Sequence, residues 1–156
     1  MESTPALQRI GLKIGLVTSL GLLAYFFIMK ALGLAHIIEL RVFNFMILGA
    51  GIIYGIQKLK AELHEPNFYL KGLVEGLFIS LVAVLPFAII ISLYLEYFDI
   101  ALMNHIKEGL SSSEYINGFS IFAIIFMEGM ASGGIIGYCA MQYFKSVWDE
   151  KEKKWV

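Results

Sequence analysis

The feature that most constrains this chain is a run of 27 residues, 118–144, in which Glu128 is the only formally charged side chain. As an α-helix the run would extend about 40 Å, whereas the hydrocarbon core of a bilayer is roughly 30 Å thick. It therefore predicts a tilted transmembrane helix. Because a carboxylate facing lipid is costly, we expect Glu128 to point into a helix bundle, into a wet cavity or at a partner subunit.

The composition of the rest of the chain agrees with a membrane protein. Of the 156 residues, 58% are hydrophobic and 16% are charged, which is far more apolar than an ordinary soluble domain. The pattern predicts an all-α fold, an integral membrane bundle of four transmembrane helices within one domain, 1–156. The expected spans are 11–34, 38–58, 72–95 and 117–144, with an outer loop at 96–116 that contains a short amphipathic helix.

The first span has a competing interpretation as a cleaved signal peptide. In that reading Arg9 and Lys13 form the basic start, and Gly33-Leu34-Ala35 forms a cleavage site with small residues at its first and third positions. The uncharged run 14–29 is long for a signal core, and Lys30 lies just before the supposed cut. These two features favour a retained helix.

The distribution of basic residues predicts the orientation. Nine Lys and Arg residues lie in the N-terminal region, the 58–71 connection and the C-terminal tail, against three on the other side. By the positive-inside rule, both termini are cytoplasmic. We expect a multi-pass protein of a bacterial inner membrane in contact with membrane lipid.

Small residues recur four positions apart in the predicted spans, and this spacing lets helix backbones approach closely. The glycines expected to pack in this way are Gly51, Gly55, Gly72, Gly76, Gly129, Gly133 and Gly137.

Four residues are candidates for a functional role. Glu128 shares one face of its helix with Ser132. Glu75 lies four residues after Lys71, so we expect an ion pair with that lysine near the interface. Pro86 falls near the middle of the third span and should kink it.

The last span has a predicted start. Ser111 and Glu114 match a capping box, so we expect the fourth helix to begin near Ser112 and to continue past the membrane toward Trp148.

No motif for an enzyme is found, and we expect neither a cofactor nor a catalytic residue. The lone Cys139 cannot build a thiolate metal site, and His64 and His105 are more typical of solvated loop and interface positions, so we expect no metal. A net charge of −1 gives no basic excess for nucleic acid.

The order of segments also carries a resemblance. A glycine-rich second helix ends GIIYGIQKLK, a third opens FYLKGLVEGLFISLVAVL, and a glycine-rich last helix follows a long outer loop. In this order the chain resembles the DUF4199 family of small four-helix membrane proteins, common in Bacteroidetes. It departs from that family at HEPNFY, where the family often has a glycine-rich turn before the third helix. The resemblance implies a four-helix membrane fold and transfers no functional residue.

Two hypotheses about function follow. The first is a structural or interaction subunit that packs with itself, as a homo-oligomer, or within a larger membrane complex. The second is a small ion or proton channel or transporter that uses Glu128. The sequence leaves open whether Glu128 is a structural hydrogen-bonding acid or a chemical one.

The charge distribution makes a testable prediction about topology. A reporter that is active only in the cytoplasm should be active when fused after Lys58 or at the C-terminus, and inactive when fused near Gly109. An active fusion near Gly109 would mean that the number of spans is wrong.

Overall fold

The fold is seen in a computed structural model, which describes residues 3–34, 38–62, 68–108 and 117–153. The described elements are all helical. The long helices are α1 (Ser3–Ala31), α2 (Val42–Glu62), α3 (Phe68–Tyr97) and α5 (Gly118–Lys153). The short ones are η1 (Ile38–Arg41), a single turn before α2, and α4 (Ile100–Glu108).

Among the described residues, four segments are long and apolar enough to cross a membrane, as expected. They are Leu7–Ala31, Val42–Glu62, Phe68–Tyr97 and Gly118–Phe144. The short helix expected within the outer loop is also present, as α4.

The boundaries of these segments differ from the expected ones for local reasons. The first ends at Ala31, before residue 34, because Gly33 adopts a left-handed conformation with φ of 72°. The Gly33 and Leu34 amides then donate to the carbonyls of Lys30 and Met29, which is a Schellman cap. The second segment begins at Val42 because residues 38–41 form the separate turn η1, and the third extends beyond both expected ends.

The expected start of the last helix near Ser112 lies outside the described residues. The described helix begins at Gly118, and Asn117 caps it by accepting a hydrogen bond at its Oδ1 from the Ser120 amide, 2.9 Å away. The capping-box residues Ser111 and Glu114 lie outside the described residues. As predicted, the helix extends beyond its apolar segment, to Lys153.

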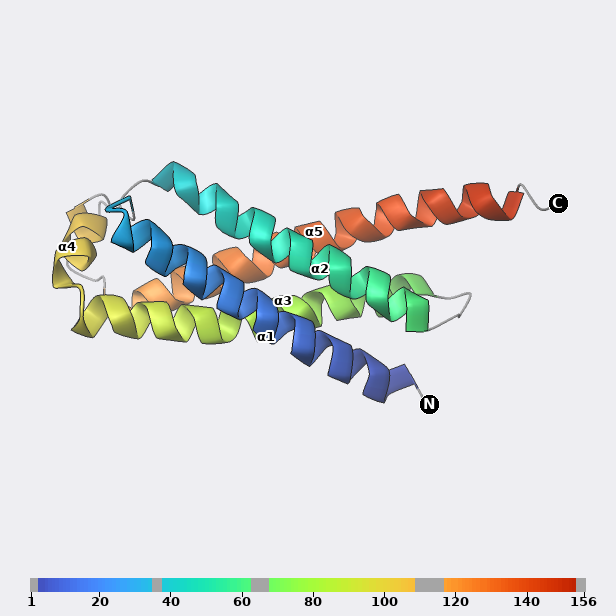
Figure 1. The fold of residues 1–156 in the computed structure, drawn as a ribbon, viewed down its shortest axis with the longest axis horizontal. Helices are drawn as coiled ribbons and strands as arrows, with labels where there is room; N and C mark the ends of the chain where they lie inside the picture. The colour runs from blue at the N-terminus through green and yellow to red at the C-terminus, as the bar shows by residue number, and fades with distance from the viewer. Residues whose placement is uncertain (1–2, 35–37, 63–67, 109–116, 154–156) are drawn as a thin grey trace.

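The helices are arranged around α3, which packs against α1, α2 and α5. Helix α2 also contacts both α1 and α5, so α1 and α5 flank the α2–α3 pair (Figure 1). The two chain ends emerge at the same end of the bundle, and α4 lies across the opposite end (Figure 1). We call these the terminal end and the α4 end.

The core consists of two apolar clusters stacked along the bundle. The cluster nearer the terminal end brings together Ile14, Ile52, Ile56, Ile79 and Met141 from all four long helices. The cluster nearer α4 includes Leu22, Phe87, Ile91, Met103 and Ile121.

Glycines set the spacing between α3 and α5. A Cβ placed on Gly76 would lie 3.3 Å from the Cα of Gly137, so the two backbones almost touch. A Cβ on Gly133 would collide with Ser80, and one on Gly129 would collide with Val84. The two helices therefore pack closely along a stretch of several turns.

The other interfaces use the same device. On α1, a Cβ at Gly11 would collide with Phe78 and one at Gly15 with Val82, both on α3. On α2, Gly51 faces Thr18 and Gly55 faces Ile79. Each of α1, α2 and α5 thus presents a glycine to a neighbouring helix.

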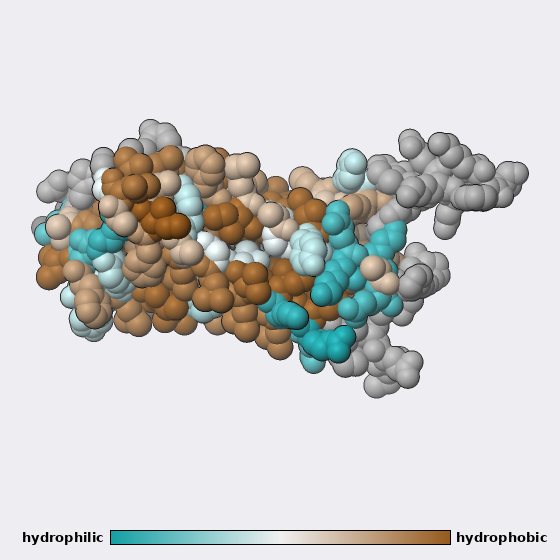
Figure 2. Space-filling model, viewed as in Figure 1, coloured by the Kyte–Doolittle hydropathy of each residue, from teal (hydrophilic) through white to brown (hydrophobic). Residues whose placement is uncertain are grey.

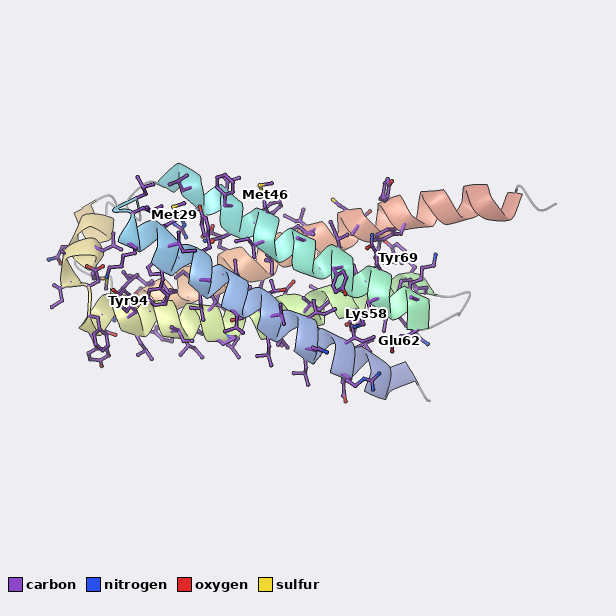
Figure 3. All side chains as sticks on the ribbon, viewed as in Figure 1. Met29, Met46, Lys58, Glu62, Tyr69 and Tyr94 are labelled. Atoms are coloured by element: carbon purple, nitrogen blue, oxygen red, sulfur yellow. The ribbon has the colours of Figure 1, made fainter. Side chains whose placement is uncertain are left out.

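The surface matches a protein that crosses a bilayer. Hydrophobic side chains cover most of the face seen in Figure 2, and hydrophilic ones gather toward the terminal end. Lys58, Glu62 and Tyr69 lie at that end and Tyr94 lies near α4 (Figure 3). This distribution is typical of an apolar band between two polar rims.

The close packing predicts different outcomes for two adjacent glycines. Gly133→Ala should destabilise the bundle by about 1–3 kcal/mol, because the new methyl group overlaps Ser80 across the α3–α5 interface. Gly134→Ala should be neutral or stabilising by up to about 1 kcal/mol, since its methyl would lie 3.7 Å from Leu77, an ordinary contact. Unfolding in mixed micelles measures both changes, and equal effects would contradict the interface.

Candidate functional site

An ion pair on the bundle surface connects the end of η1 to α5. The Nη2 atom of Arg41 donates to Oε2 of Glu128 at 2.7 Å. The side chains are 48% and 55% exposed, so the pair lies on the outside of the bundle. Of the three surroundings expected for Glu128, the interior of this bundle is therefore wrong, and a partner subunit stays a prediction.

The contribution of this ion pair to stability differs between water and lipid. An exposed ion pair in water contributes only about 0–1 kcal/mol. Glu128, however, follows Gly118 by ten residues, or about 15 Å of helix, inside a segment able to cross a membrane. A lone carboxylate there would cost several kcal/mol, and the long Arg41 side chain brings a compensating charge from the end of η1.

Other exposed residues of α5 lie on the same side of the helix as Glu128. At 3.6 residues per turn, Cys139 lies about 20° around the helix from Glu128, and Ile135 lies about as close. Both are exposed. Gln142, farther along, donates to the Tyr69 hydroxyl of α3 at 3.2 Å. Ser132, one turn beyond Glu128, is half-buried. We call the stripe of Glu128, Ile135 and Cys139 the α5 face.

Glu75 has the opposite environment. Its side chain is fully buried in α3, and neither carboxylate oxygen has a hydrogen-bond partner. The expected pair with Lys71 is thus not formed. The reason is the rotation of α3, which turns Glu75 together with Gly76 and Ile79 toward neighbouring helices instead of toward the surface.

The remaining candidates do not join these groups into one site. Helix α3 continues through Pro86, which is half-buried. Glu75 and Glu128 have separate environments. Among the residues that the structure describes, no cluster of His, Cys, Asp or Glu could hold a metal ion. His105 lies in α4, and His64 falls outside the described residues.

A second charged cluster lies at the α4 end of the bundle. Lys30, in the last turn of α1, pairs with Asp99 at 2.9 Å and lies 4.2 Å from the centre of the Tyr94 ring. Asp99 also caps α4, since its Oδ1 accepts from the Leu102 amide at 3.1 Å. The Lys30 hydrogen bond, opposed by burial and reinforced by the Leu102 amide, holds the pKa of Asp99 below its usual value. This cluster joins α1, α3 and α4, which makes it structural.

Sequence reasoning missed both ion pairs. Arg41 and Lys30 are two of the three outer basic residues, and the sequence alone assigns an acidic partner to neither. Asp99 carried a usable signal, because an acidic residue directly before Ile100 stands at an N-cap position. Arg41 carried none, since 87 positions separate it from Glu128.

Comparison with known proteins does not extend this picture. No protein-family model, no curated protein and no solved structure matches the chain.

The Asp99 cluster predicts a dependence of stability on pH. Because the folded pKa is lower than the unfolded pKa of about 3.9, the pair stabilises the fold above that value, and the stabilisation is lost as pH falls through the folded pKa. Asp99→Asn keeps the cap but removes the charge. It should lower stability at neutral pH by roughly 1 kcal/mol and abolish this part of the acid loss. Thermal unfolding measured across pH tests this prediction. If the wild type and Asp99→Asn lost stability in parallel as pH fell, the result would contradict the role of Asp99.

Proposed function

We propose that this protein is a small interaction subunit of a membrane, and that a second copy of the chain docks on its α5 face. The observation that carries the proposal is an exposed ion pair between Glu128, inside the segment Gly118–Phe144 that is able to span the bilayer, and Arg41, which directly precedes the segment Val42–Glu62. Lipid tails cannot solvate such a pair, whereas a protein surface with polar groups can. A docked partner would remove the charges from lipid.

The coverage of the helices supports the choice of this face. In the most apolar stretch of α3, 50% of the residues are buried inside the bundle, against 17% in α5. Helix α5 therefore has the most surface left for a partner. Exposed residues near the α5 face include Ile124, Met127 and Tyr138.

The charges favour a second copy over another partner. The patch contains one positive and one negative side chain, so two copies related by a two-fold axis can place Arg41 of each against Glu128 of the other. Such a patch is complementary to itself. A different membrane protein bound at the same face would instead make the chain a subunit of a larger complex.

The cellular setting is part of the proposal. The charge bias supports both termini in the cytoplasm, and the resemblance to the DUF4199 family supports a bacterial inner membrane. Neither suggests an enzymatic activity.

Transport through Glu128 has weaker support. Glu128 opens to the outer surface and pairs with an arginine, which does not give up its proton and so cannot relay one. The described cleft lined by Ile56, Gln57, Lys60 and Phe144 lies toward the terminal end, on other residues than Glu128. A path for ions along the axis has no support from these positions.

Cysteine cross-linking tests the docking face directly. Oxidation in native membranes should link two copies through the exposed Cys139, and Cys139→Ser should abolish the link. In that background, Ile135→Cys should restore a dimer, whereas Leu93→Cys, which is also exposed but lies on α3, should not. Equal linking at both positions, or a strictly monomeric protein in native mass spectrometry, would contradict the proposal. A link only to a different polypeptide would replace the second copy with another partner.

A charge swap tests the role of the pair itself. Arg41→Glu and Glu128→Arg should each reduce Cys139 cross-linking strongly, because each places two like charges together. The double variant should restore it, since it recreates the pair with the signs exchanged. Linking that is unchanged in both single variants would remove the pair from the interface.

A further inference from the structure

Glu75 is a buried acid that belongs neither to the α5 face nor to the charged cluster at the α4 end. Its exposure is 0%, and both carboxylate oxygens lack a hydrogen-bond partner. The α1 backbone closes over it at Gly11, where a Cβ would lie 3.2 Å from Oε1. Phe78, one turn along α3, lies against the same glycine. The carboxyl group is therefore sealed between two helices.

The charged residues of the surrounding helices do not neutralise Glu75. Along α1, Arg9 and Lys13 are equally close to Gly11, and Arg9 pairs with Glu62. The nearest along the other two helices are Lys58 on α2 and Lys71 on α3. Lys13 is exposed and the lysines on α2 and α3 are half-buried, and neither oxygen of Glu75 accepts a hydrogen bond from any of them. On α5, the described acid Glu128 is held at the surface by Arg41. An ionised Glu75 would thus be an uncompensated charge in an apolar interior.

Burying an unpaired carboxylate is among the most costly arrangements in a protein. Three occupants could remove that cost: a metal cation, a positively charged side chain or a proton. A metal cation needs several oxygen ligands, and the described residues contain no cluster of three candidate ligands. No described charged side chain donates a hydrogen bond to either oxygen of Glu75. A proton needs no additional space and no further ligand.

We propose that Glu75 is a proton-binding site and that its proton holds α1 against α3 at Gly11. Binding converts the carboxylate to a neutral acid that the packed interface tolerates. Release leaves a carboxylate, which requires the two helices to part at Gly11 and Phe78 so that water or a lysine can reach it. The contact between α1 and α3 at this site thus depends on the proton, and it is separate from the α5 face.

The position of Glu75 makes exchange with solvent feasible. It follows Phe68, the first residue of α3, by seven positions, which is about 10 Å of helix. Lys58 and Glu62 of α2 mark the same end of the bundle, the terminal end (Figure 3). A modest parting of α1 from α3 at this end would expose the acid without disturbing the cluster near α4.

Infrared spectroscopy of the full chain in lipid nanodiscs tests the proton directly. A neutral carboxylic acid has a C=O stretching band that a carboxylate lacks. We expect the wild-type protein to show this band at neutral pH, shifted in heavy water, and Glu75→Gln to lose it. Glu96→Gln, which changes an exposed acid at the other end of α3, is the matched control and should keep the band. Absence of a Glu75-dependent acid band, with carboxylate bands in its place, would overturn the proposal.

The dependence of stability on pH tests the coupling to packing. Because the packed state binds the proton more tightly than the separated state, the wild-type melting temperature should fall as pH rises, and Glu75→Gln should remove that part of the fall. Cross-linking at Cys139 should be unchanged in Glu75→Gln, which separates this inference from the proposed docking. A variant whose melting temperature follows pH like the wild type would contradict a proton-dependent contact, whether or not dimers form.

Discussion

The close contact between α3 and α5 at Gly76 and Gly137 is the interaction on which the rest of the structure depends. Within a membrane, burial from water does not drive two helices together, so their association depends on how closely they pack. The two glycines let the backbones approach until a single Cβ would nearly reach the opposite Cα. This contact fixes the rotation of α3, and the rotation decides which of its residues face α1 and α2.

The positions of the two acids follow from this arrangement. With its glycines turned toward α3, α5 presents Glu128 outward, where Arg41 can reach it. With Gly76 turned toward α5, α3 presents Glu75 to Gly11 of α1, where no charged group reaches it. Two acids at comparable distances from a helix start thus differ completely in exposure. The exposed Glu128 therefore supports a docking surface, and the buried Glu75 supports a proton-binding site.

The sequence predicted the four apolar helices and the helix in the outer loop, because length and hydropathy are local properties. It did not predict the direction of Glu128, because a helix with a glycine stripe and a polar stripe can bury either one. The partner that settled the choice, Arg41, is distant in the chain. For Glu75, the spacing of four residues from Lys71 suggested an ion pair with that lysine. The spacing of Gly72, Gly76 and Ile79 would have indicated the buried face, and α1 packing there decided the outcome.

A double-mutant cycle at Gly76 and Gly137 tests the central contact most directly. A Cβ on Gly76 would lie 3.3 Å from the Cα of Gly137, which is a tight contact, so Gly76→Ala should lower the free energy of unfolding. A Cβ on Gly137 would lie 3.8 Å from the Cα of Gly76, which is an ordinary contact, so Gly137→Ala should cost little by itself. We predict that the effects of the two substitutions do not add, with a coupling of about 0.5–3 kcal/mol, because both methyl groups would enter the same space between α3 and α5. Losses that add to within roughly 0.5 kcal/mol would show that the two glycines do not meet.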